Sequence, residues 1–132
     1  MQHAIPHRPG ETQGPGPLSP LERAVLTAML VGGAQGDSDT FAGLRAQLAR
    51  ATVVSRTHSG VGFVTRIAVP DEVPPVPDAA GRALRPVTAA HPALPEQAEF
   101  LLQLRNGRLA VLEAYCHAGN WPADEAEFRV VG

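Results

Sequence analysis

The dipeptide Asn106-Gly107 restricts the possible folds of this chain more than any other feature of its sequence. It lies between two runs of alternating apolar residues within the segment 99–115. Both residues tolerate the positive φ angles of a tight turn, so the dipeptide predicts two antiparallel strands joined by a two-residue connection. Arg105 then lies opposite Arg108, and this pair sets the register of the hairpin.

This register places a carboxylate among apolar side chains. Phe100 lies opposite Glu113, and they share a face with three further pairs, Leu104 with Leu109, Leu102 with Val111, and Ala98 with Tyr115. That face is the more apolar of the two, so we expect it to point at the core. An unpaired buried carboxylate is costly, and Glu113 must therefore find a partner, reach solvent or hold a proton.

Three roles are open for Glu113. It can form a buried pair with Arg56 or Arg66 from an earlier hairpin, or with the hydroxyl of Tyr115, and so pin two hairpins together. It can instead lie solvated at the rim of a pocket, or act as a general acid or base. If the buried pair exists, Glu113→Ala should destabilise the fold strongly.

Two amphipathic helices are predicted ahead of the strands. The run Ser19-Pro20-Leu21-Glu22 is a helix start, with Ser19 as the cap and Glu22 closing a capping box. Gly32-Gly33 ends this helix. The apolar stripe from Phe41 to Ala51 predicts a second helix after a short polar connection, and together they form a helical hairpin.

The strand signals complete an α+β pattern. The β-branched segment 52–57 and the alternating segment 63–69 predict another hairpin, whose turn contains Gly60 and Gly62. Weaker signals predict strands at 87–90 and 125–131. We therefore expect an N-terminal helical hairpin packed on one face of an antiparallel sheet of about five strands.

Length and composition set the predicted domain limits. A chain of 132 residues has the size of one domain. Residues 1–18 are rich in proline and glycine and lack periodicity, which predicts a flexible tail. Residues 19–132 are then a single α+β domain, with a proline-rich surface loop at 70–86 and Trp121 closing the edge of the core.

Charge and cysteine content disfavour several classes of protein. Eleven basic and 13 acidic residues leave a net charge of −2, which disfavours nucleic-acid binding. No apolar run approaches the about 20 residues of a membrane span. The single cysteine, Cys116, and the lack of an apolar secretory stretch at the N-terminus predict a cytoplasmic protein. The basic residues are all arginine, a bias typical of GC-rich bacterial genomes.

Motifs for metals, cofactors and catalysis are missing. The histidines show no metal-ligand spacing on a helix, and the segment 59–62 lacks the third glycine of a dinucleotide fingerprint. Adjacent strand residues point to opposite faces, so Cys116 and His117 cannot form a dyad of their own. We predict no metal, no cofactor and no catalytic residue.

The leading functional hypothesis is a small cytoplasmic, non-enzymatic protein-interaction module. An accessory factor, an immunity-type factor and a homodimer all fit this hypothesis. It depends on the second face of the 99–115 hairpin, where arginines are mixed with leucines. The side chains expected there are Leu101, Gln103, Arg105, Arg108 and Leu112.

The alternative is a small-ligand-binding module or a hydrolase-like enzyme. Its pocket would be built around Glu113, Arg56 and Tyr115, with His58 beside them. The glycines between 60 and 62 would then let a ligand approach the backbone closely.

Three pieces of the sequence stand out as a set. They are an arginine followed by Gly60-Val61-Gly62-Phe63, then Asn106-Gly107-Arg108-Leu109 leading into Leu112-Glu113-Ala114-Tyr115, and finally Trp121-Pro122. Through them the segment 19–131 resembles a group of small bacterial proteins of unassigned function. The resemblance implies a compact α+β domain and supplies no catalytic residues.

Overall fold

The computed structural model describes residues 10–31, 38–77 and 86–131. Its helices are α1 (Pro20–Met29) and α2 (Ser38–Arg50), and a 3-10 turn, η3, covers Glu125–Glu127. The strands are β1 (Thr12–Gln13), β2 (Thr52–His58), β3 (Gly62–Ala68), β4 (Val87–Ala90), β5 (Ala98–Arg105), β6 (Arg108–Tyr115) and β7 (Arg129–Val130).

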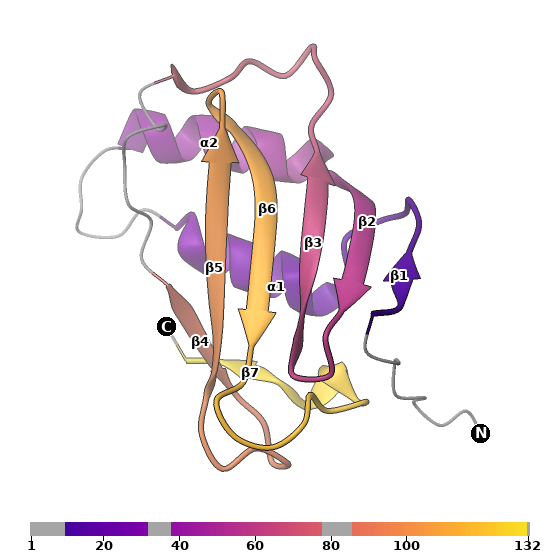
Figure 1. Cartoon of the computed structure of the whole chain (residues 1–132). Helices are drawn as coiled ribbons and strands as arrows, with labels where there is room; N and C mark the ends of the chain where they lie inside the picture. The colour runs from indigo at the N-terminus through magenta and orange to yellow at the C-terminus, as the bar shows by residue number, and fades with distance from the viewer. Residues whose placement is uncertain (1–9, 32–37, 78–85, 132) are drawn as a thin grey trace.

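Within these described residues, seven strands form one antiparallel sheet in the order β1-β2-β3-β6-β5-β4-β7 (Figure 1). The α+β class is therefore confirmed, and the sheet has seven strands where about five were predicted. Both helices lie behind the same face of the sheet in Figure 1, and the opposite face is uncovered toward the viewer. We call the uncovered side the open face and the side toward the helices the inner face.

Helix α1 begins as the sequence predicts. The Ser19 side chain accepts a hydrogen bond from the Glu22 N–H at 3.1 Å, and Glu22 Oε1 accepts one from the Ser19 N–H at 2.8 Å. At its other end, Arg45 of α2 donates to the Leu30 carbonyl at 2.7 Å. The predicted stop at Gly32-Gly33 and the turn of the predicted helical hairpin lie outside the described residues.

The two-residue turn at Asn106-Gly107 is confirmed, because Arg105 pairs with Arg108. Both turn residues have positive φ angles, 52° and 75°. A β-bulge follows immediately, since Leu104 pairs with Leu109 but Gln103 pairs with Val111. The extra residue on β6 shifts the partners of every later residue by one position.

The bulge overturns the predicted interior position of Glu113. This residue pairs with Leu101 of β5 and with Val64 of β3, on the open face. Its Oε1 accepts a hydrogen bond from Gln103 Nε2 at 2.8 Å in an exposed setting. Leu112, predicted on the exposed face, is instead fully buried on the inner face. The shift by one residue exchanged the two faces of this part of β6.

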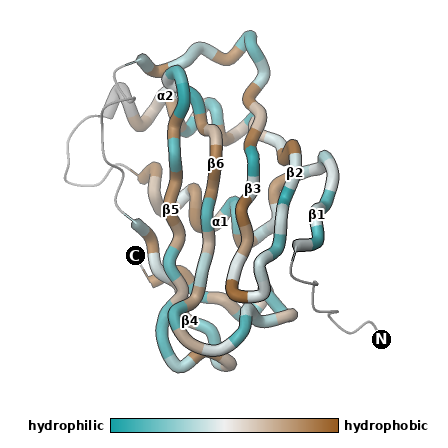
Figure 2. Tube along the Cα trace, in the orientation of Figure 1, coloured by the Kyte–Doolittle hydropathy of each residue, from teal (hydrophilic) through white to brown (hydrophobic). Residues whose placement is uncertain are grey.

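The core lies between the inner face and the two helices. Alternating hydrophobic and hydrophilic residues along β5 and β6 are visible in Figure 2. Trp121 packs against the core, with its ring centroid 5.5 Å from that of Phe63 and 6.0 Å from that of Phe100, as predicted for a residue at the core edge. The largest fully buried apolar side chains are Phe63, Phe100, Leu26, Leu30, Leu44, Leu109 and Leu112.

A buried amide fixes the turn end of the β5–β6 hairpin to the core. Gln47 of α2 donates to the Gly107 carbonyl at 2.9 Å and to the Pro74 carbonyl at 3.2 Å. Its Oε1 accepts from the Leu109 N–H at 2.9 Å. One buried side chain thus joins α2 to backbone groups of the loop after β3 and of the β5–β6 hairpin.

The two ends of the described chain differ from prediction. Residues 1–9 of the predicted flexible tail lie outside the described residues, but β1 pairs with β2, Gly16 bridges to Val53, and Leu18 is buried. The edge of β2 offers unpaired backbone groups, and the tail supplies partners for them. The predicted strand 87–90 is confirmed as β4, whereas only Arg129–Val130 of the segment 125–131 is a strand.

Among residues 10–31, 38–77 and 86–131, no helix combines the length and the apolar character that crossing a bilayer requires.

Candidate functional site

The sheet separates the four residues of the predicted ligand site into two pairs. Arg56 and His58 lie on β2, opposite the buried residues Thr65 and Phe63, so they belong to the inner face. Glu113 and Tyr115 lie on β6 and belong to the open face. The four side chains therefore do not share a pocket.

The inner face holds a buried ion pair that the sequence reasoning missed. Glu22 of α1 is fully buried, and Arg56 Nε donates to its Oε2 at 2.8 Å. A second guanidinium nitrogen of Arg56 donates to Glu22 Oε1, and the Thr65 hydroxyl donates to Oε2. With the Ser19 N–H, four donors saturate one carboxylate. A buried Glu–Arg pair thus exists, with Glu22 in the role predicted for Glu113.

The electrostatics of this pair favour two charged partners. Burial opposes the charged form of Glu22, but hydrogen bonds from Arg56, Thr65 and the Ser19 backbone outweigh it, and the pKa of the carboxyl lies below its ordinary value. Burial likewise opposes the charged form of Arg56, yet Glu22 outweighs it and raises the pKa of the guanidinium. Both shifts describe one ion pair that stays ionised.

We expect this ion pair to make the stability of the fold depend on acid. The depressed pKa means that the unfolded chain takes up the Glu22 proton at a higher pH than the folded chain does. The ion pair stabilises the fold fully at pH values above the pKa that Glu22 has in the unfolded chain. This stabilisation is lost as the pH falls through the lower pKa that Glu22 has in the folded chain. The free energy of unfolding should therefore fall as the pH drops below about 5.

Urea denaturation at a series of pH values from neutral to acid measures this dependence. The Glu22→Gln variant should be less stable at neutral pH and should lose less stability on acidification. Glu113→Gln, which changes an exposed carboxylate, is the matched control and should follow the wild-type curve. Parallel curves for wild type and Glu22→Gln would contradict the expectation.

Polar contacts continue from the ion pair to the edge of the sheet. Gln13 Oε1 on β1 accepts from Arg56 Nη1 at 2.9 Å and lies 3.3 Å from His58 Nε2. The amide oxygen can only accept, so His58 Nε2 carries a hydrogen in this contact. His58 itself is buried, with 4% of its surface exposed. Arg56 and His58, predicted together, do belong to one network.

A small pocket of about 90 Å³ lies beside this network. It is lined by His58, by Gly60 of the β2–β3 turn, by Gly62 at the start of β3, and by residues 121–123 with Glu125. Trp121 connects the β2–β3 turn to the 3-10 turn η3. Its backbone N–H donates to the Gly60 carbonyl at 2.9 Å, and its Nε1 donates to Glu125 Oε2 at 2.8 Å. His58 and the two glycines were predicted for a pocket, whereas Glu125 and Trp121 were not.

Tyr115 belongs to a separate cluster on the open face. Its ring contacts that of His117 edge-on, with the centroids 5.2 Å apart, and His117 Nε2 is hydrogen-bonded to Glu99 Oε2. Desolvation and the neighbouring Glu99 carboxylate raise the pKa of the Tyr115 hydroxyl. The phenol therefore stays protonated at neutral pH.

Cys116 and His117 follow the end of β6, so the strand alternation assumed for them does not apply, and their side chains differ in burial. Cys116 is buried and its thiol faces the Gly119 carbonyl at 3.7 Å, whereas His117 is exposed. Burial raises the pKa of the thiol, which disfavours the thiolate needed for nucleophilic attack. In the part of the chain that the structure describes, no three His, Cys, Asp or Glu side chains gather to hold a metal ion.

Comparisons of the chain with protein-family models, with curated proteins and with solved structures found no significant match.

Proposed function

We propose that this chain is a non-enzymatic protein-interaction module that binds through its open face, and that its partner is a second copy of the chain. The observation that carries the proposal is the pattern of charges on that face. Its central strands carry Thr57, Val64, Arg66, Glu99, Leu101, Gln103, Arg105, Val111, Glu113 and Tyr115.

The middle of the open face is apolar enough for contact with protein. Val64 is 40% exposed, and Leu101 and Val111 are partly exposed on the neighbouring strands. Strand pairing places Val64 and Leu101 on either side of Glu113. Apolar side chains surrounded by charged ones are typical of protein contact surfaces.

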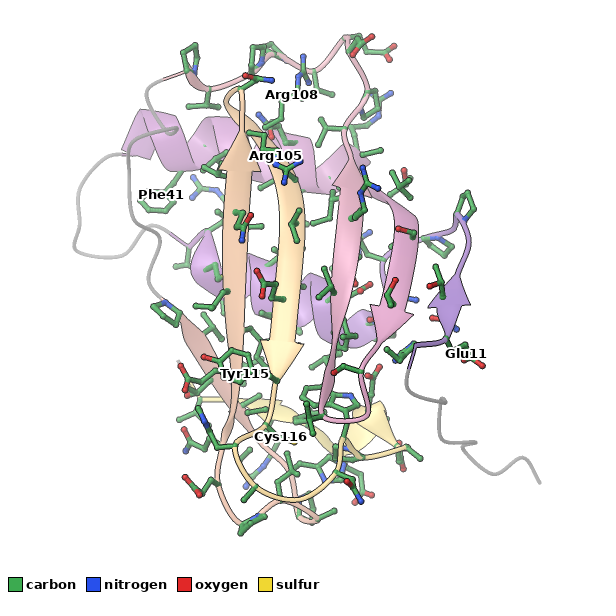
Figure 3. The ribbon with its side chains drawn as sticks, in the orientation of Figure 1. Glu11, Phe41, Arg105, Arg108, Tyr115 and Cys116 are labelled. Atoms are coloured by element: carbon green, nitrogen blue, oxygen red, sulfur yellow. The ribbon has the colours of Figure 1, made fainter. Side chains whose placement is uncertain are left out.

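The charges on the open face change sign along the strands. Arg105 lies next to the β5–β6 turn and Arg66 lies opposite Val111, whereas Glu113 and Glu99 lie progressively farther from the turn. Figure 3 shows Arg105 and Tyr115, the neighbour of Glu99 on β6, at opposite ends of the open face. The face is thus basic at one end and acidic at the other.

This polarity makes the open face complementary to itself. Two copies can face each other across a two-fold axis that lies in the plane of the interface and runs across the strands. This axis places the acidic end of each copy on the basic end of the other. It also stacks β5 on β5, which brings Glu99 of one copy toward Arg105 of the second. An axis parallel to the strands would oppose like charges, which is destabilising.

The size of the face predicts weak association. Four strands of seven or eight residues, β2, β3, β6 and β5, span it. Strand spacing and rise give a patch of about 19 by 24 Å. An interface of this extent falls at the low end of specific complexes, so we expect a dissociation constant in the micromolar range or weaker.

Charge reversal tests the proposed dimer. Sedimentation equilibrium of the wild type up to millimolar concentration should show a monomer–dimer equilibrium that weakens with salt. Arg105→Glu or Glu99→Arg alone should weaken dimerisation at least about tenfold. Each variant creates a repulsive contact between like charges, and the two-fold symmetry places that contact in the interface two times. The double reversal should restore affinity to within about threefold, since complementary ends meet again.

Arg50→Glu is the matched control for these reversals. Arg50 is an exposed residue of α2, behind the sheet, and its reversal should leave dimerisation unchanged. A wild type that stays monomeric at millimolar concentration would overturn the proposal, and so would a double reversal that fails to restore association.

The interior supports a module without substrate turnover. Within the described residues, every buried side-chain nitrogen and oxygen has a hydrogen-bond partner, and the residues suggested for a hydrolase-like pocket lie on opposite faces. The single cysteine and the arginine bias support a cytoplasmic protein of bacterial origin, and the proteins that the segment 19–131 resembles are bacterial. An accessory or immunity-type role remains part of the same proposal.

A further inference from the structure

We infer that His117 makes the proposed dimer sensitive to acid, so that two copies associate at neutral pH and separate as this histidine takes up a proton. The inference rests on the proposed function, because the dimer is the state whose stability His117 changes. Three observations carry it. They are the place of His117 at the acidic end of the open face, its hydrogen bond to Glu99, and its exposure to solvent.

His117 lies two residues beyond Tyr115, the last residue of β6. Its Nε2 is hydrogen-bonded to Glu99 Oε2, and its ring contacts the Tyr115 ring edge-on. The Tyr115 hydroxyl is hydrogen-bonded to the same carboxylate. The groups that face His117 are therefore Glu99 from β5 and Tyr115 from β6, and Glu113 on β6 acts on Tyr115 from farther along the strand. Glu99 is the anion of this cluster, so the protonation state of His117 decides whether its charge is balanced within the same chain.

At neutral pH this contact leaves the charge of the acidic end in place. A neutral imidazole whose Nε2 carries the hydrogen donates to the Glu99 carboxylate without cancelling its charge. The carboxylate is held on the open face by this bond and by the bond from Tyr115, and 31% of the Glu99 side chain is exposed. Glu99 can then meet Arg105 of the second copy, as the proposed two-fold axis requires.

Protonation of His117 removes this attraction. The imidazolium and the Glu99 carboxylate together carry no net charge, so the acidic end is neutralised within one copy. In the proposed dimer the imidazolium also lies close to Arg105 of the second copy, and like charges repel each other. The two-fold symmetry places this conflict in the interface two times. Association must therefore release protons, and the affinity should rise with pH over the range in which histidine changes its charge.

The range from about pH 7.5 to about pH 5.5 isolates histidine from the other titrating groups. Glutamate and aspartate side chains ordinarily take up protons at lower pH. The loss of stability through Glu22 is likewise expected only below about pH 5. His58 and His91 are buried, whereas 45% of the His117 side chain is exposed. Among the histidines that the structure describes, His117 is therefore the one that takes up a proton without any opening of the fold.

Sedimentation equilibrium at about pH 7.5 and about pH 5.5, at one low salt concentration, tests the inference. The wild-type dissociation constant should be at least about tenfold higher at the lower pH, because each copy brings a new positive charge to the interface. His117→Gln keeps a donor for Glu99 and stays neutral. Its affinity should lie within about threefold of the wild type at the higher pH and should change less than about twofold between the two pH values.

His117→Arg is the complementary variant, since it is charged at both pH values. It should associate at the higher pH as weakly as the wild type does at the lower pH. Thr27→Arg is the matched control, because it adds the same charge at an exposed position of α1, behind the sheet. This control should dimerise like the wild type at both pH values. Both substituted positions are exposed, so we expect both variants to fold.

Three results would overturn the inference and leave the dimer in place. They are a wild-type affinity that is equal at both pH values, a His117→Gln protein that keeps the wild-type pH dependence, and a His117→Arg protein that associates as tightly as the wild type at the higher pH. A wild type that stays monomeric at the higher pH up to millimolar concentration would instead overturn the proposed dimer, and the acid sensitivity with it.

Discussion

Replacing Glu22 with alanine is expected to lower the free energy of unfolding by about 3–5 kcal/mol. The substitution removes the carboxylate that binds the Arg56 guanidinium through two hydrogen bonds, although only 15% of the Arg56 side chain is exposed. It also removes the acceptor of the Thr65 hydroxyl and of the Ser19 N–H. The loss of stability comes mainly from the buried charge that remains rather than from the bonds removed.

Urea denaturation at neutral pH measures this effect, and Glu113→Ala is its matched control. Glu113 also accepts a side-chain hydrogen bond, from Gln103, but in an exposed setting. Its removal should change the free energy of unfolding by no more than about 0.5 kcal/mol. If Glu22→Ala cost no more than Glu113→Ala, the buried ion pair would not stabilise the fold in the way we describe.

Replacing Gly62 with alanine is expected to cost at least about 3 kcal/mol. A Cβ at this position would lie 1.8 Å from the Ala114 carbonyl oxygen and 2.8 Å from the Tyr115 Cα. Both atoms belong to the backbone of β6, so no side-chain rotation can relieve the overlap. The chain must either separate β3 from β6 or bend β3 at its first residue.

Gly14→Ala is the control for the Gly62 variant. A Cβ on Gly14 meets no atom within 4 Å, and the residue is exposed. We expect this change to alter the free energy of unfolding by about 0.5 kcal/mol or less. Thermal melts of both variants give the comparison, and a Gly62→Ala protein as stable as Gly14→Ala would show that β3 and β6 do not approach so closely.

Local signals in the sequence predicted the elements of the fold better than their register. The Asn106-Gly107 turn and the start of α1 at Ser19 follow from backbone preferences of a few residues, and both were predictable. The β-bulge between the pairs Leu104–Leu109 and Gln103–Val111 was not, because the apolar run from Leu109 to Leu112 contains no residue that marks an extra position in the strand. That one residue reversed the predicted positions of Glu113 and Leu112.

The sequence did contain a signal for the buried acid, on another element. Glu22 precedes Val25, Leu26 and Met29 at spacings of three, four and seven, so it lies within the apolar stripe of α1. The capping box by itself accounts for a glutamate at this position, so Glu22 was not predicted to be buried. The pairing with Arg56 was beyond prediction, because it depends on contacts between residues 34 positions apart.

The double role of Glu22 has a consequence for how the molecule opens. The same carboxylate closes the first turn of α1 and holds Arg56 on β2, so that turn cannot fray without releasing a charge from the sheet. Helix ends usually open locally at little cost. We therefore expect the first turn of α1 and strand β2 to open as one cooperative unit, with amide protons that exchange with solvent only when helix and sheet come apart together.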